Sequence, residues 1–191
     1  MALPVLFILL AISAYLFTYW HTTYRVVKAH HFLHEEAYWL DMCLRKEIKN
    51  LRDTSGDNFR VKHTTLHSLD AGLALIDQEG KLVKSLYLRK KQNRPCLYLK
   101  YGEHPATEIA DNIQCFTISY GIKATQTSPL FYTDNPSAYA LNQIRVIQLN
   151  FLLQSKNEVL FNRMSYSFNG KNIIPQDRKI YLPLKIVTSM A

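Results

Sequence analysis

The chain has 191 residues, a formal net charge of +8 and 48% hydrophobic residues, and this length suits one domain with its own core. The three cysteines are too few for a disulfide-rich scaffold, and none lies in the CxxC spacing of a zinc site. Lysine and arginine are scattered without a nucleic-acid-binding motif, so the charge indicates a basic surface first and contact with anionic lipid or nucleic acid second.

The N-terminal stretch is the most apolar part of the chain. Residues 2–20 carry no charged side chain, and as a helix they would be about 28 Å long, close to the hydrocarbon thickness of a bilayer. Tyr15, Tyr19 and Trp20 gather near its end, as aromatic side chains do at membrane interfaces. No basic residue precedes the stretch, which argues against a cleavable signal peptide. We therefore predict that residues 1–20 belong to a transmembrane helix.

The helical pattern continues over residues 21–52, which contain neither proline nor glycine. Apolar residues recur there at steps of three and four, which predicts an amphipathic helix with one buried stripe. The stripe residues expected to pack on the sheet are Leu33, Ala37, Leu40, Leu44, Ile48 and Leu51. We therefore expect one helix of about 50 residues that starts in lipid, ends near Gly56 and packs its second half against a globular domain.

From residue 53 to residue 191 the apolar spacing changes to a period of two, which is typical of β-strands. The strands we expect cover residues 73–76, 82–89, 96–101, 113–122, 143–154, 159–168 and 179–188. Residues 77–80 and Asn169-Gly170 are turn signals, and residues 102–112 and 123–140 are expected to form loops. The predicted fold class is α+β, with a long N-terminal helix packed on a mainly antiparallel β-sheet domain.

Histidine pairs are the main candidates for a metal site. His30 and His34 are spaced i, i+4 on the predicted helix, and His63 and His67 repeat this spacing, but neither pair has an evident third ligand. A solvated polar face explains them more simply. The chain carries no P-loop, HExxH, dinucleotide-binding or nucleophile-elbow motif. We predict no catalytic site, no cofactor and no metal.

Cys96 and Cys115 lie on two of the predicted strands. In each strand the cysteine lies on the face opposite to the heavier apolar side chains, so a disulfide is compatible with their positions if the strands pair. Such a bond would close a loop of about 20 residues and stabilise the fold by about 3 kcal/mol. Two separate thiols explain the pattern equally well. Cys43 is expected to pack beside the helix stripe.

Two groups of stretches carry a family resemblance. Residues 21–25 (HTTYR) and the run 40–51 lead from the apolar stretch into the amphipathic one, and residues 110–122 (ADNIQCFTISYGI) and 144–153 are strand-like. Together they resemble type IV pilins, and in detail PilW-like minor pilins, which are related to the J-type pseudopilins of type II secretion. The resemblance implies a pilin-like fold, a single-pass anchor in the bacterial inner membrane and a β-rich domain in the periplasm.

The resemblance also implies a function and partners. The chain would be a structural subunit that takes part in the initiation and assembly of type IV pili. Its N-terminal helix would contact other minor pilins and the major pilin, and the inner-membrane assembly platform would be a further partner. Two alternatives stay open: a J-type pseudopilin of type II secretion, and a membrane-anchored periplasmic binding module. The positive charge would suit DNA as the ligand of such a module.

The N-terminus departs from the family pattern. Pilins of this class carry a basic leader that ends in glycine, followed by Phe-Thr-Leu-Ile-Glu-Leu-Met. Alignment on Tyr24-Arg25 places Met1 at about the last residue of that motif, so we expect that the sequence begins at an internal methionine. Basic residues of a preceding leader would also agree with the positive-inside rule, whereas Arg25 and Lys28 alone would place the rest of the chain in the cytoplasm.

Overall fold

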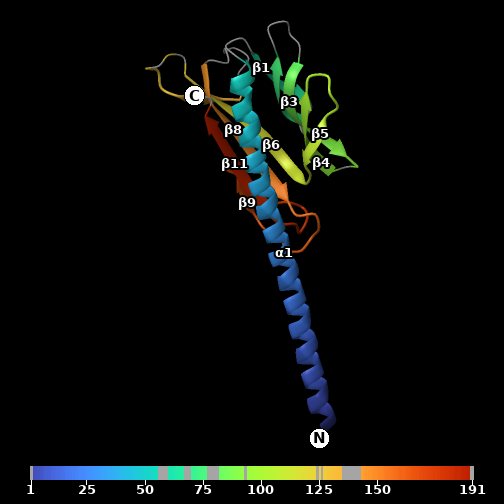
Figure 1. Cartoon of the computed structure of the whole chain (residues 1–191). Coiled ribbons are helices and arrows are strands. Elements are labelled where there is room, and N and C mark those ends of the chain that lie inside the picture. The colour runs from blue at the N-terminus through green and yellow to red at the C-terminus, as the bar shows by residue number, and fades with distance from the viewer. Residues whose placement is uncertain are drawn as a thin grey trace.

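The structure, a computed structural model, describes residues 2–55, 60–66, 70–76, 82–92, 94–123, 125, 127–134 and 143–189. One long helix, α1 (Ala2–Ser55), precedes all the described strands. Its N-terminal part extends away from the strands, and its C-terminal part lies against them (Figure 1). We call residues 3–20 of α1 the stem, and the strands with the part of α1 that packs on them the head. The predicted α+β class, with a long helix on antiparallel strands, is confirmed.

The first half of the head is a five-stranded sheet in which every neighbouring pair is antiparallel. Strand order follows chain order, so each connection joins adjacent strands, as is usual for antiparallel sheets. The strands are β1 (Arg60–Leu66), β2 (Asp70–Ile76), β3 (Leu82–Lys91), β4 (Arg94–Tyr101) and β5 (Thr107–Ala110). This sheet lies on one side of the upper part of α1 (Figure 1).

The second half of the head is a four-stranded antiparallel sheet with strand order β11-β8-β6-β7, accompanied by a short hairpin of β9 and β10. The strands are β6 (Ile113–Ile122), β7 (Phe131–Thr133), β8 (Ile144–Gln154), β9 (Tyr166–Phe168), β10 (Lys171–Ile173) and β11 (Tyr181–Ser189). The hairpin turns at Asn169-Gly170, where both φ angles are positive, at 51° and 73°. A two-residue turn with positive φ at both positions matches strand twist, so this predicted turn is confirmed.

The main core lies where α1 meets both sheets. It combines the buried stripe of the helix with the inward residues of β3, β4, β6, β8 and β11. Within it, Phe116 and Phe151 stack with ring centroids 4.6 Å apart, and Tyr120, four residues further along β6, is fully buried. A second, smaller cluster of Leu152, Phe168 and Tyr181 packs on the other face of β8. Because a buried large apolar side chain contributes about 1.5–3 kcal/mol, this shared core fixes the helix to the sheets.

Several predicted boundaries differ from the observed ones. The helix continues to Ser55, while Gly56 lies outside the described residues. The expected strand over 159–168 is wrong, because only Tyr166–Phe168 pairs. The amides of Val159 and Leu160 instead donate to the carbonyl of Arg178, at 3.1 and 3.0 Å, which holds this segment as an irregular connection.

Strands that were not predicted account for the remaining differences. β5 lies inside the predicted loop 102–112, and β7 lies inside the predicted loop 123–140. β1 and β10 had no predicted counterpart. The turn signal at 77–80 lies outside the described residues, although the strands that flank it, β2 and β3, pair antiparallel. β5, β7 and β10 have three or four residues, too few to produce a recognisable alternation in sequence. β1 has seven residues, but only Val61 and Leu66 are apolar, so it shows no alternation either.

Candidate functional site

The stem is the most unusual surface of the molecule. Its large apolar side chains, from Leu3 to Trp20, are 50–73% exposed. Among the described residues, α1 is long and apolar enough to cross a membrane. Monomeric soluble proteins rarely expose a contiguous apolar surface of this extent. The stem therefore needs apolar surroundings, either lipid or other apolar helices.

Three threonine hydroxyls at the end of the stem and just beyond it are satisfied within the helix. The hydroxyls of Thr18, Thr22 and Thr23 donate to the carbonyl oxygens four residues earlier, at 2.8–2.9 Å. Such bonds remove the penalty for placing a hydroxyl in an apolar environment. Thr18 in the stem, and Thr22 and Thr23 just beyond it, can consequently lie beside lipid without an unpaired hydroxyl.

Burial begins gradually beyond the stem. Val26 and Ala29 are half-buried against the main core, and the stripe residues further along are buried with exposed fractions of 0–7%. These buried stripe residues are Leu33, Ala37, Leu40, Leu44 and Ile48. The side chain of Leu51, the sixth residue of the predicted stripe, lies outside the described part. The helix thus changes from exposed at Trp20 to buried on one face at Leu33, over about three and a half turns.

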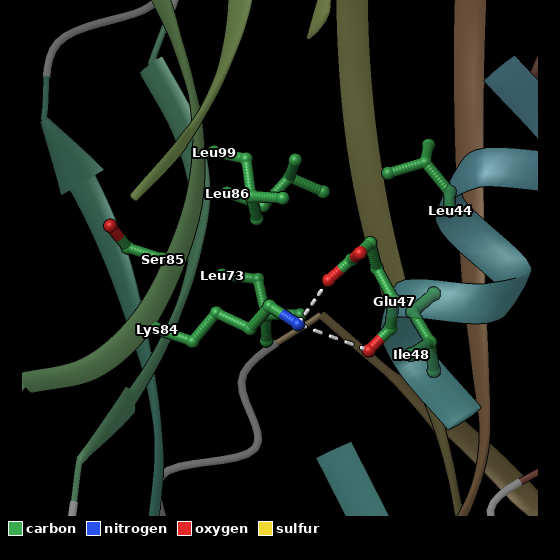
Figure 2. A pocket seen from close by; sticks show the side chains of 8 residues that line it. All are labelled: Leu44, Glu47, Ile48, Leu73, Lys84, Ser85, Leu86 and Leu99. Atoms are coloured by element: carbon green, nitrogen blue, oxygen red, sulfur yellow. Dashed lines mark hydrogen bonds and ion pairs between the residues drawn. The ribbon is translucent and has the colours of Figure 1, made fainter. Parts of the chain in front are cut away.

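A polar contact fastens α1 to the five-stranded sheet (Figure 2). Lys84 of β3 forms an ion pair with the carboxylate of Glu47, and its Nζ also donates to the Glu47 carbonyl oxygen at 3.3 Å. The hydroxyl of Tyr101 donates to Oε2 of Glu47 at 2.6 Å, and Lys84 Nζ lies 4.7 Å from the Tyr101 ring centroid. Leu44, Ile48, Leu73, Leu86 and Leu99 surround these groups and leave a cavity of about 20 Å³.

The electrostatics of this contact are asymmetric. Burial by itself would raise the pKa of Glu47, but the hydrogen bonds from Lys84 and Tyr101 outweigh it and hold the pKa below its ordinary value. Burial, followed by the neighbouring Glu47 carboxylate, raises the pKa of Tyr101 to about 12. At neutral pH the contact is therefore a carboxylate held by an ammonium and a phenol, which suits a structural clamp.

A second clamp joins α1 to the four-stranded sheet. Arg45 pairs with Asp41 one turn earlier, at 2.8–2.9 Å, and its Nη1 donates to the carbonyl oxygen of Val187 in β11 at 2.7 Å. The same turn of the helix is thus held by both sheets. The sequence did not reveal either clamp, but Lys84 shares its strand face with Leu86 and Leu88, and an inward lysine is the signal that could have found the first one.

A third polar group lies nearer to the stem. Glu36 is half-buried, its Oε2 has no hydrogen-bond partner among the described residues, and Asp111 lies close to it. Burial, and next the charge of Asp111, raise the pKa of Glu36 to about 7, while Lys156 acts in the opposite direction. Lys156 Nζ lies 3.6 Å from Asp111 Oδ2 and 5.0 Å from the ring centroid of Phe32. This group couples the helix to the segment after β8.

The two candidate disulfide cysteines are not brought together. Cys96 lies in β4 of the five-stranded sheet and Cys115 in β6 of the four-stranded sheet, so the strands do not pair, and both residues are free thiols, as is Cys43. Cys96 is buried, and its Sγ donates to the Arg94 carbonyl oxygen at 3.6 Å. Cys115 packs against the smaller cluster of the second sheet. The strand pairing that the bond required is therefore absent.

The histidines of the second half of α1, His30, His31 and His34, are exposed. The rings of His30 and His34 stack with centroids 6.5 Å apart, and His31 Nδ1 lies 3.5 Å from Glu35 Oε1. His63 lies in β1, and His67 falls outside the described residues. Over the described ranges, no group of three or more His, Cys, Asp or Glu side chains could hold a metal ion. The described part of the chain thus consists of an apolar stem that is joined through the continuous helix α1 to a β-rich head.

Comparison with known proteins gives limited results. No protein-family model matches the chain, and no curated protein sequence matches it. Among solved structures, the type IV-like pilin TTHA1219 from Thermus thermophilus is similar: the match covers 82% of this chain and 96% of that chain, at 11% sequence identity and with a TM-score of 0.49.

Proposed function

We propose that the chain is a minor pilin of the PilW-like kind, a structural subunit that takes part in the initiation and assembly of type IV pili. The observation that carries the proposal is the division of α1. Its stem is exposed and apolar on all sides, whereas the following half is buried along one stripe and clamped to two sheets. A subunit that leaves a membrane and enters a fibre needs this division.

The physical argument concerns where the stem can reside. Each large apolar side chain gains about 1.5–3 kcal/mol when it leaves water, so a stem of this composition is strongly disfavoured in water. In lipid the stem is solvated by acyl chains. When a subunit leaves the membrane, the same surface must be covered by the stems of neighbouring subunits. We therefore propose that the stem contacts other minor pilins and the major pilin, with the inner-membrane assembly platform as a further partner.

The same division supports a single-pass anchor, and the resemblance to type IV pilins supports a head in the periplasm. The chain would cross the bacterial inner membrane once with its stem and place the head in the periplasm. Charged side chains of the head hold the helix to the sheets, through the Glu47–Lys84 ion pair and through the Arg45 hydrogen bond to the Val187 carbonyl oxygen. This use of charged residues supports a structural role rather than an enzymatic one.

A J-type pseudopilin of type II secretion is the second candidate, because it would require the same division of the helix. The two candidates differ in which system fails when the gene is deleted. Loss of sheared surface pili with normal secretion supports the pilus role, and the reverse result supports the secretion role. A third outcome, normal pili and secretion with reduced salt-sensitive DNA binding by the isolated membranes, would favour the binding module.

Complementation of the deletion strain tests the role of the stem. We expect the wild-type gene to restore pili and Leu9→Arg to restore none, because a charged side chain near the centre of an apolar helix costs several kcal/mol in a membrane. Gln114→Arg is the matched control, since it adds the same side chain at an exposed position of β6. Full restoration by Leu9→Arg, with the protein present in the membrane fraction, would contradict the proposal.

A further inference from the structure

The end of the head from which the stem emerges contains a basic hollow. It has a volume of about 320 Å³ and lies between α1 and the segment that follows β8. Arg25 and Lys28 line it from the helix, and Lys156 lines it from the segment. Phe32 forms an apolar wall over which the Lys156 ammonium lies. Three cations thus surround a space of the size that a small ligand group occupies.

The charges in this hollow are only partly compensated. Arg25 Nη2 donates to the carbonyl oxygen of Glu158 at 3.4 Å, and the Glu158 carboxylate is itself paired with Arg178 at 3.1 Å. Lys156 has Asp111 beside it at 3.6 Å. Within the described ranges, neither Arg25 nor Lys28 forms an ion pair with a carboxylate. The hollow is therefore suited to an anionic group.

The position of the hollow identifies the source of that group. Arg25 is five residues beyond Trp20, or about 8 Å along the helix, which is the depth of the headgroup layer beside the hydrocarbon core. Side chains of a helix lean toward its N-terminus, so Arg25 and Lys28 lean toward the stem and the proposed membrane. A phosphate in the headgroup layer would consequently lie within their reach.

Exposed apolar side chains accompany the basic ones at this end. The connections between β8 and β11, drawn orange to red, lie where the stem leaves the head (Figure 1). They carry Phe161, Met164 and Ile174, which are 70%, 52% and 67% exposed. Residues 155–179 also contain five Lys or Arg and two acidic residues. Basic groups interleaved with exposed apolar ones are the composition of surfaces that lie in a membrane interface.

We propose that this end of the head docks onto an anionic lipid surface, with a headgroup phosphate between Arg25, Lys28 and Lys156 and with Phe161, Met164 and Ile174 in the interface. The inference rests on the proposed membrane anchor, and it adds a contact of the head that holds it against the bilayer before assembly. Because each Lys or Arg near an anionic surface contributes about five-fold in affinity, removal of all three cations should shift docking by about a hundred-fold.

The test uses the full chain in nanodiscs of phosphatidylcholine alone or mixed with phosphatidylglycerol. The chain has two tryptophans, Trp20 and Trp39, so W20F/W39F/F161W carries one indole at the proposed contact. We expect lipids brominated near the headgroup to quench this indole in anionic nanodiscs and much less in neutral ones. High salt should reverse the quenching, because exposed charges are screened beyond a Debye length of about 3 Å at 1 M.

Two charge variants of W20F/W39F/F161W test whether the three cations of the hollow cause the quenching. R25Q/K28Q/K156Q should abolish the quenching. K46Q/K49Q/K123Q removes equal charge at the far end of the head and should leave the quenching unchanged. At that end Arg45 donates to the carbonyl oxygen of Val187, and the Lys123 amide donates to the carbonyl oxygen of Gln143. Equal melting temperatures of both variants would show that the head stays folded. The inference is overturned if quenching is equal in neutral and anionic nanodiscs, or if R25Q/K28Q/K156Q is quenched as strongly as its parent.

Failure of the anchor is measured separately. In the W39F chain the remaining Trp20 reports on insertion of the stem. If lipids brominated at Trp20 depth quench it while the indole of W20F/W39F/F161W is not quenched, the anchor stands and the docking inference is overturned. If Trp20 is not quenched, the proposed anchor fails and the docking inference fails with it.

Discussion

The two halves of α1 share one continuous helix but have opposite surroundings. Residues 3–20 expose apolar side chains in every direction, while residues 33–48 bury one stripe and expose the rest. The backbone hydrogen bonds of both halves are the same, so the difference lies entirely in which side chains meet the sheets. The head is therefore stabilised by the C-terminal half of α1, and the N-terminal half is available to lipid or to other chains.

Core truncation in the two halves should give the largest contrast. Leu40 is fully buried in the main core, so we expect Leu40→Ala to lower the free energy of unfolding of the head by about 2–5 kcal/mol. Leu9→Ala removes the same atoms from the stem, where Leu9 is 56% exposed, and it should leave the head unchanged. Chemical denaturation of the full chain in detergent, followed by near-ultraviolet circular dichroism, measures both. Equal losses would show that the stem contributes to the head.

Removal of one partner of the Glu47 clamp should have the next largest effect. The side chains of Lys84 and Glu47 are only 10% and 18% exposed, so Lys84→Met leaves a poorly solvated carboxylate and should cost about 2–4 kcal/mol. Lys91→Met, which breaks the exposed pair with Glu108, is the matched control and should change little. A loss from Lys84→Met no larger than the control would contradict the clamp.

Titration of Glu36 should produce a smaller, pH-dependent effect. Its pKa rises from 4.5 to about 7 on folding, so between these values the folded state binds more protons than the unfolded state. Stability of the head should therefore fall as pH rises from 4.5 to 7, by about 1 kcal/mol after allowance for the partial exposure of the group.

Glu36→Gln should remove this dependence and leave the variant more stable than the wild type above pH 7. Glu35→Gln, at the neighbouring exposed position, is the control and should keep the wild-type slope. Thermal melting at several pH values measures the slope. A wild-type slope in Glu36→Gln would mean that Asp111, Lys156 or another group carries the dependence.

The smallest effect is expected from a reducing agent, which tests whether Cys96 and Cys115 are free thiols. Because Cys96 and Cys115 are free thiols on strands that do not pair, we expect a reducing agent to leave the melting temperature of the head unchanged. The intact mass under non-reducing conditions should equal that of three free thiols. A mass lower by two hydrogens that is lost in Cys96→Ser would establish the bond instead.

Much of this architecture could be predicted from the sequence. The long helix, its stripe spacing and the strands at 113–122 and 143–154 came from apolar periods that extend over ten residues or more. Three of the four strands that were not predicted, β5, β7 and β10, are three or four residues long, and the fourth, β1, has seven residues but no apolar alternation. The error at 159–168 has another cause, because the amides of Val159 and Leu160 bond to a carbonyl eighteen or more residues away, which no local pattern reveals.

The sequence by itself determined that one helix would be apolar on all sides at its start and on one side afterwards, because periodicity is a local property of the chain. Only the tertiary structure decided that the strands form two sheets, that Cys96 and Cys115 lie in different ones, and that Glu47 meets Lys84 and Tyr101. It also decided that Arg25 and Lys28 face Lys156. Glu47 and its partners, and Arg25 and Lys28 with Lys156, are more than thirty positions apart in sequence, so packing rather than local sequence brings them together.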